Sequence, residues 1–213
     1  SSIRRKESGP GEVTFENPNI TATSATFTGA GTYGIQLVAT HGEKTGRGLI
    51  TVIIEPFAAT ITKRFHPVED VYLEGDVGKN DKYLKVKGTR RIAYLKFEVK
   101  DLPSKVLSAT LRLAENGNSG SGTLNILRGK SHEWSEAAFD KASAPAAGEV
   151  VGIRTGSTSG EYISIPVDAL VTGNGTVTAI LKLEKDGDDI WFGSNESDKK
   201  PELIVVAEDP EKL

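Results

Sequence analysis

The chain has 213 residues, of which 37% are hydrophobic and 26% are charged, with a formal net charge of -3. This hydrophobic content is enough for a packed core and excludes a disordered chain. There is no Cys, which excludes disulfides, thiolate metal sites and a cysteine nucleophile, and no apolar run approaches the roughly 20 residues that span a bilayer.

Short segments in which apolar and polar residues alternate with period two run along the whole chain, and helical periodicity is almost absent. Clusters of Gly, Asn, Asp, Ser and Pro separate them, which is typical of turns between strands. In chain order the segments are 12–17, 33–40, 49–55, 93–99, 109–115, 123–129, 162–167, 176–184 and 202–208. Many short strands at this spacing predict an all-β fold of the β-sandwich, jelly-roll-like type.

A boundary between two strand series lies near Pro56, within the segment IIEPFAATIT. We therefore predict a small N-terminal β domain at residues 1–56. The larger β-sandwich is predicted at residues 57–213, close to the usual size of a single domain.

The segment from Lys79 to Lys100 is strongly basic in this acidic chain. It reads as two strands joined by a Gly-containing turn, and alternation puts Lys85 and Lys87 on one face. The segment contains eight basic residues and only two acidic ones, Asp81 and Glu98. The basic residues are Lys79, Lys82, Lys85, Lys87, Arg90, Arg91, Lys96 and Lys100. This excess predicts a patch for a polyanion, against the simpler interpretation of a solubilising surface or a strand edge guarded by Lys.

Aromatic rings near this patch are candidate platforms for the apolar face of a sugar. Tyr94 is two residues from Lys96 and so lies on the same strand face, and Tyr83 is a further candidate. Trp191 and Phe192 are adjacent and must point to opposite faces of a strand, so one is expected in the core and the other is free to face a ligand.

Catalytic motifs are weak. Gly29, Gly31 and Gly34 spell G-x-G-x-x-G, but a strand pattern follows where a dinucleotide site needs a helix. The three His residues occur singly, so zinc hydrolysis has no ligand set, and there is no G-x-S-x-G elbow.

Two acidic clusters are expected to be solvated loop residues, although a glycosidase needs only two carboxylates in one groove. A structural calcium ion is an open alternative at such turns. The clusters are Glu69, Asp70, Glu74 and Asp76, and Asp186, Asp188 and Asp189.

Residues 8–54 resemble the latter half of a PKD-like, immunoglobulin-type domain. The shared pattern runs from Ser-Gly-Pro-Gly through Val-x-Phe-x-Asn-Pro and Ala-Thr-Phe to Gly-Thr-Tyr. The first strands of that family are missing here, so the resemblance implies a partial domain with an open strand edge.

Residues 60–208 resemble the DNRLRE-type β-sandwich module, which includes carbohydrate-binding modules of alginate lyases and other polysaccharide-degrading enzymes. The resemblance rests on the order of segments 94–117, 132–149, 166–183 and 190–206, and on Pro201-Glu202-Leu203. The usual Ser-Arg-Glu reads Ser194-Asn195-Glu196, and this replacement of Arg weakens any role assigned to that loop. In the resembling family the segment that holds Trp134 packs under the sheet, so the resemblance implies that Trp134 lies in the core. In alginate-binding members Lys and Arg on the early strands hold the ligand, and the matching residues here are Lys82, Lys85, Lys87, Arg91 and Lys96.

We therefore expect a noncatalytic carbohydrate-binding module that anchors a secreted or cell-surface bacterial polysaccharide-degrading enzyme to an acidic polysaccharide such as alginate. Two alternatives are a structural or adhesion module without glycan binding, and a small lyase that uses Tyr94, Lys96 and Arg91. A monomer without cofactor, nucleic acid or membrane partner is expected. The expected ligand residues are Lys82, Lys85, Lys87, Arg91, Tyr94, Lys96 and Trp191.

Overall fold

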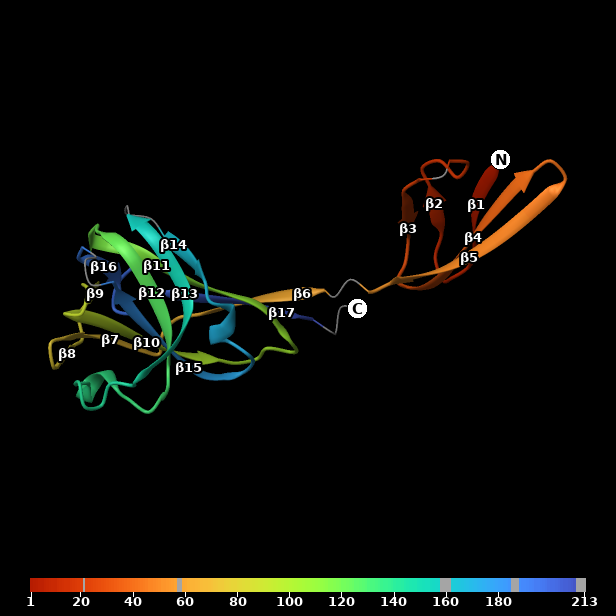
Figure 1. Cartoon of the computed structure of the whole chain (residues 1–213). Helices are drawn as coiled ribbons and strands as arrows, with labels where there is room; N and C mark the ends of the chain where they lie inside the picture. Colours follow the sequence, from red (N-terminus) through yellow and green to blue (C-terminus); the bar gives the residue numbers. More distant parts are fainter. Residues whose placement is uncertain (21, 57–58, 158–161, 185–187, 210–213) are drawn as a thin grey trace. The chain divides into compact units, whose positions relative to one another are not determined.

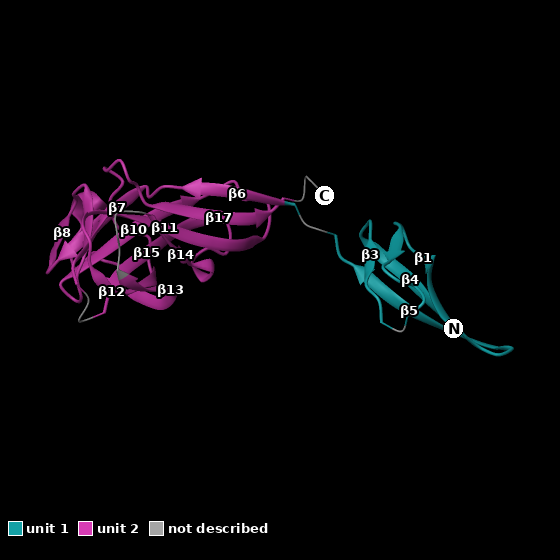
Figure 2. Cartoon of the chain, turned by 90° about the horizontal axis from the view of Figure 1, so that it is seen from above, with its two compact units in different colours: residues 1–59, 211–213 teal, residues 60–210 magenta. Residues whose placement is uncertain are grey.

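The computed structural model describes residues 1–213 except 21, 57–58, 158–161, 185–187 and 210–213. Its regular elements are nearly all β-strands (Figure 1), so the all-β prediction is confirmed. The chain divides into two compact units between Ala59 and Thr60 (Figure 2), whereas the sequence placed the boundary after Pro56. None of the helices in the described ranges has the length and apolar character of a membrane-spanning segment.

The N-terminal unit contains a three-stranded antiparallel sheet, in the order β1-β4-β5, and a separate pair of strands, β2 and β3. The Tyr33 ring is buried between them, and its hydroxyl donates to the Gly29 carbonyl at 2.7 Å. The strands are β1 (Ser2–Ser8), β2 (Val13–Phe15), β3 (Ala25–Phe27), β4 (Gly31–His41) and β5 (Lys44–Ile54).

Strand β5 ends this sheet and is solvated on both faces over most of its length. Leu49 and Ile53 are each 64% exposed and Ile50 is 60% exposed. Neighbouring side chains on one strand point to opposite faces, so both faces of β5 present apolar surface to water.

The larger unit is a sandwich of two antiparallel sheets. The first, which we call the β10 sheet, has the strand order β13-β12-β15-β10-β7-β8. Its strands are β7 (Glu69–Glu74), β8 (Val77–Lys79), β10 (Arg91–Val99), β12 (Ser121–Gly129), β13 (Ala147–Ser157) and β15 (Gly175–Leu183).

The second sheet, the β11 sheet, has the order β6-β17-β11-β16-β9, with β14 also paired to β11. Its strands are β6 (Thr60–Phe65), β9 (Tyr83–Val86), β11 (Val106–Asn118), β14 (Tyr162–Pro166), β16 (Ile190–Gly193) and β17 (Glu202–Glu208). Two short 3-10 helices, η1 (Glu136–Ala138) and η2 (Asp168–Leu170), lie in connections.

The main core lies between the inner faces of the two sheets. Alternation on β10 sends Leu95 and Phe97 inward, and alternation on β16 sends Ile190 and Phe192 toward them. Burial of a large apolar side chain contributes about 1.5–3 kcal/mol, so this contact fixes which side chains remain on the outer faces.

A second, smaller core lies on the outer face of the β10 sheet, beneath the connection 130–146. Trp134 from that connection is buried, as predicted, and its indole N–H donates to the Thr178 hydroxyl at 3.1 Å. The cluster consists of Val71, Leu73, Tyr94, Trp134, Phe139 and Ile180.

The two strands predicted within residues 82–99, joined by a Gly-containing turn, are confirmed as β9 and β10. The chain turns at Gly88, where the backbones of Lys87 and Arg91 pair. Beyond this bridge β9 joins the β11 sheet and β10 joins the β10 sheet. The apolar sides of the two strands face the core from opposite directions, so they cannot share one sheet.

The first acidic cluster was wrongly expected to be a solvated loop, because Glu69–Glu74 is strand β7. Asp70 is only 1% exposed. Its Oδ2 accepts the N–H of Asn195 at 2.7 Å, and its Oδ1 has no hydrogen-bond partner in the described part of the chain. Burial, reinforced by the charges of Glu196 and Glu136, raises the pKa of Asp70 to about 7.

This raised pKa predicts a pH-dependent stability difference between the natural protein and Asp70→Asn. An Asp in the unfolded chain titrates near pH 3.9, so the folded state binds this proton more tightly. The stability contributed by protonated Asp70 is then lost as the pH rises from about 4 through about 7. The free energy of unfolding, measured in urea, should therefore rise for Asp70→Asn relative to the natural protein between pH 5 and pH 8.

The exposed Asp198 provides the control, since Asp198→Asn should show no such gain. A constant difference between Asp70→Asn and the natural protein across this range would contradict a change in the protonation of Asp70 between pH 5 and pH 8.

Candidate functional site

Four of the side chains considered in the sequence come together on the outer face of the β11 sheet. Trp191 on β16 lies opposite Lys85 on β9, and Gly193 lies opposite Tyr83. Because Leu84 and the other alternate residues of these strands fill the core, the side chains between them point outward. We call Lys82, Tyr83, Lys85 and Trp191 the lysine–aromatic cluster.

The rings and cations of the cluster are in direct contact. The Lys85 ammonium lies 4.4 Å from the centroid of the Trp191 ring, and the Lys82 ammonium lies 5.1 Å from that of Tyr83. The two ring centroids are 5.4 Å apart. The Trp191 indole nitrogen is buried and has no acceptor among the described residues.

Gly117 on β11 makes room for these rings. Its φ is +109°, and a Cβ there would lie 3.3 Å from Trp191 Cε3 and 3.5 Å from the Tyr83 ring. Glycine adopts this backbone conformation without strain. The absence of a side chain therefore lets both rings lie close to the β11 backbone.

Lys85 is held in place as well as charged. Its ammonium donates to Asp81 Oδ2 at 3.3 Å. Burial lowers the pKa of Lys85, but the Tyr72 hydroxyl and the Asp81 carboxylate outweigh burial and leave the pKa above its usual value. Lys85 thus keeps its charge over the ordinary pH range.

Arg91 is engaged by two carboxylates. Its Nη2 is 2.6 Å from Glu74 Oε1, and its Nη1 is 2.6 Å from Asp189 Oδ2. The hydrogen bonds from Arg91 lower the pKa of Glu74. A polyanion would have to displace both carboxylates before it could bind Arg91. The main role of Arg91 is therefore to link β7 to the start of β16.

The structure does not support Tyr94 as a stacking platform. Its side chain is on the same face as Lys96, as predicted, but it is only 5% exposed. Phe139 packs on it with ring centroids 4.9 Å apart. The connection 130–146 thus occupies the face where a sugar would have to stack.

Lys96 is also largely committed within the protein. Its ammonium bonds the Glu69 carboxylate and the Trp134 carbonyl. The lyase grouping of Tyr94, Lys96 and Arg91 is therefore not assembled in one open groove, since one member is buried and the other two are ion-paired.

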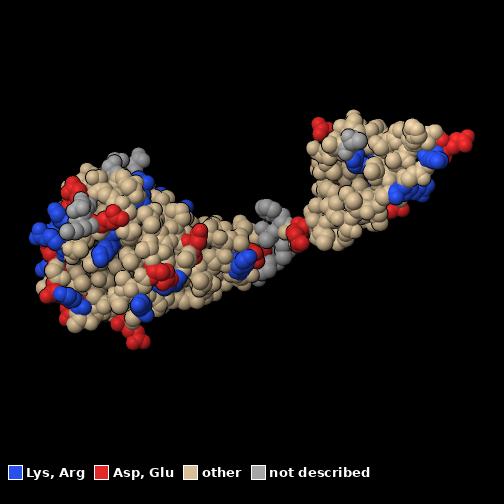
Figure 3. All heavy atoms as spheres, viewed as in Figure 1, with Lys and Arg blue, Asp and Glu red and all other residues tan. Residues whose placement is uncertain are grey.

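The basic stretch is less one-sided in space than in sequence. Lys and Arg side chains on the larger unit are interspersed with Asp and Glu over the face seen in Figure 3. Several of the basic side chains form ion pairs with acidic ones, including Lys85–Asp81 and Arg91–Glu74. The net positive potential is smaller than the sequence count implies.

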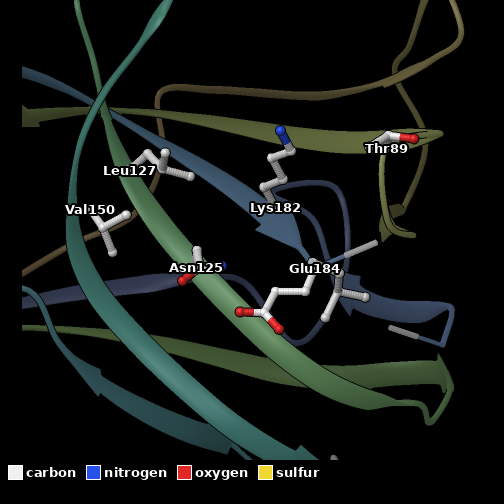
Figure 4. A pocket seen from close by; sticks show the side chains of 7 residues that line it. Thr89, Asn125, Leu127, Val150, Lys182 and Glu184 are labelled. Atoms are coloured by element: carbon white, nitrogen blue, oxygen red, sulfur yellow. The ribbon is translucent and has the colours of Figure 1, made fainter. Parts of the chain in front are cut away.

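A hollow on the outer face of the β10 sheet was not found from the sequence. It has a volume of about 400 Å³, and its lining comes from β12, β13, β15 and the turn at Thr89 (Figure 4). The lining residues are Thr89, Asn125, Leu127, Val150, Lys182, Leu183 and Glu184. Alternation indicates that Asn125 and Lys182 point outward, but the pairing of β12 with β15 was needed to bring them together.

The calcium alternative rests partly on Asp186, which lies outside the described residues. Among the residues that are described, no group of three or more His, Cys, Asp or Glu side chains is placed to hold a metal ion.

Comparison with known proteins identifies one family. The model of carbohydrate-binding module family 96 matches residues 61–207. No curated protein matches the chain. A solved structure described as "Structural basis for the promiscuous specificity of the carbohydrate-binding modules from the beta-sandwich super family" is 13% identical, covering 93% of this chain and 84% of the other. Its TM-score of 0.18 is too low to support an argument.

The geometry predicts that Arg91 acts mainly in stability. Arg91→Ala would leave Glu74 and the buried Asp189 without their counter-charge, and an unsatisfied buried polar group costs about 1–3 kcal/mol. Urea unfolding should show a loss of this size. Arg64→Ala is the matched control, because Arg64 is exposed and its partner Glu202 also binds Arg112; its cost should stay within about 1 kcal/mol. Equal losses in the two variants would contradict the assignment.

Proposed function

Because the chain belongs to carbohydrate-binding module family 96, we propose that its noncatalytic carbohydrate-binding role is directed to an acidic polysaccharide. The proposed contact surface is the lysine–aromatic cluster. The family match covers residues 61–207 and therefore includes every residue of this cluster.

The observation that carries the proposal is the contact between Lys85 and the Trp191 ring. A sugar ring stacks its apolar face on an aromatic side chain, and an ammonium beside that side chain can pair with a carboxylate or sulfate of the same sugar. This combination of aromatic surface and cation suits an anionic sugar.

The expected ligand residues fall into two groups, those within the lysine–aromatic cluster and those outside it. Lys82, Lys85 and Trp191 would contact the polymer directly, together with Tyr83. Lys87, at the turn after β9, remains a predicted ligand residue.

Arg91 and Lys96 would act indirectly by joining strands β10 and β7 of the opposite sheet, through their ion pairs with Glu74 and Glu69.

The finer identity is also proposed. The resemblance of residues 60–208 to DNRLRE-type modules supports an alginate-like polymer and a parent protein that is a secreted or cell-surface bacterial polysaccharide-degrading enzyme. The motifs in residues 8–54 support a partial PKD-like, immunoglobulin-type domain. In this arrangement the module would hold the enzyme near its substrate and raise its local concentration.

The double variant Lys82→Ala/Lys85→Ala tests the cluster. Loss of two exposed ion pairs at about 0.2–1 kcal/mol each should weaken alginate binding roughly 2- to 30-fold. Isothermal titration calorimetry would measure this loss, and added salt should weaken the natural protein further, because exposed charges are screened over about 8–10 Å. The melting temperature should change little.

Lys105→Ala is the matched control, since Lys105 lies next to the opposite end of β11 and is exposed. Its affinity should equal that of the natural protein. Binding of alginate, pectate and sulfated galactan that is undiminished in the double variant would sink the assignment to this cluster.

The noncatalytic role predicts that prolonged incubation with alginate or pectate releases no unsaturated or reducing ends. Ultraviolet absorbance of unsaturated uronate should remain flat at every protein concentration. A steady rise in this absorbance that scales with protein concentration would instead indicate that the chain is a lyase.

A further inference from the structure

We propose that the outer face of the β10 sheet carries a second carbohydrate site, which takes a neutral, hydroxyl-rich oligosaccharide lying across the strands. This inference goes beyond the proposed function, because it concerns the opposite sheet and a different class of glycan. The site is the hollow of about 400 Å³ in Figure 4, together with a neighbouring hollow of about 350 Å³. Thr89 lines both hollows, and we call the pair the transverse groove.

Strand register gives the groove its direction. Asn125 on β12 lies opposite Lys182 on β15 and opposite Ile153 on β13. Directly opposed residues of an antiparallel sheet point to the same face. These three side chains therefore form a row at right angles to the strands.

The neighbouring hollow extends this direction over the next strands of the sheet. Ile92 on β10 and Leu73 on β7 line it and lie opposite each other. Five adjacent strands from β13 to β7 cover about 19 Å at the usual strand spacing of about 4.8 Å. The connection 130–146 borders this part of the groove through Ala144 and Pro145.

The side chains of the groove match the needs of sugar hydroxyls. A hydroxyl both donates and accepts hydrogen bonds. The Asn125 amide does the same, the Lys182 ammonium donates, and the Glu184 carboxylate accepts. A ligand that offers several neighbouring hydroxyls can satisfy all three groups at once.

Apolar surface beside these groups suits the C–H face of a sugar ring. Val150, which lines the groove, is 48% exposed, and Ile153 on the same strand is 60% exposed. A concave surface with apolar walls and a few convergent polar groups is the usual form of a small-ligand site.

The groove carries charges of both signs, unlike the lysine–aromatic cluster. Lys182 and Glu184 line the first hollow. Arg90, Lys141 and Asp76 line the second, and Lys141 pairs with Asp76 at 2.8 Å. A uronate in the first hollow would meet the Glu184 carboxylate, and like charges repel. The Glu184 carboxylate therefore favours a neutral glycan over an acidic one there.

The test titrates the full chain with neutral hexasaccharides of cellulose, xylan, mannan and laminarin, and follows backbone amides by NMR. We expect at least one of them to shift the amides of Asn125, Leu127 and Lys182. The affinity of that ligand should fall about tenfold in Asn125→Ala/Lys182→Ala, and should be unchanged in Lys105→Ala.

Val150→Ser is a second variant that removes apolar contact at an exposed position, and it should weaken the same ligand several-fold. The amide spectra of both variants report whether they are folded. The proposal is overturned if no neutral hexasaccharide shifts the groove amides, if all shifts lie around Trp191, or if the folded variants bind as the natural protein does. Failure of alginate binding would remove the proposed function and leave this result unaffected, since the two ligand classes are titrated separately.

Discussion

The apolar contact between the two sheets of the larger unit determines the positions of its functional side chains. Side chains alternate strictly along a strand, so a shift of one residue would exchange the inner and outer faces. With Phe192 and Ile190 in the core, Trp191 must point to solvent. The same contact holds Leu84 inward and therefore places Tyr83 and Lys85 beside that ring.

A second constraint decides which outward-facing residues remain accessible. The connection 130–146 brings Trp134 and Phe139 onto the outer face of the β10 sheet and buries Tyr94. On the β11 sheet, Gly117 adds no side chain beside Trp191. The β10 sheet thus has an apolar cover over part of its outer face, whereas the β11 sheet leaves the Trp191 and Tyr83 rings uncovered by such a connection. The alternating pattern of the strands alone does not distinguish the two faces.

Much of this arrangement could be predicted from the sequence. Alternation identified most of the strands and the opposite directions of Trp191 and Phe192, and the family resemblance indicated the core role of Trp134. Strand β1 was missed because SIRRKES carries mostly charged and small residues and pairs only at the edge of a sheet. The burial of Tyr94 and Asp70 could not be predicted, because alternation gives the face of a side chain but not the distant segment that covers it. The strands on either side of Gly88 were predicted, but their entry into different sheets was not, because a tight turn is compatible with one sheet or two.

Strand β5 has a consequence for how the chain opens. A strand that ends its sheet and is wet on both faces lacks the packing that resists local unfolding. The order of hydrogen exchange follows from this difference: the amides of β5 lose protection through local fraying, long before those of β10 or β15, which exchange only when the sandwich itself unfolds. One polypeptide therefore contains segments with very different lifetimes of the folded state.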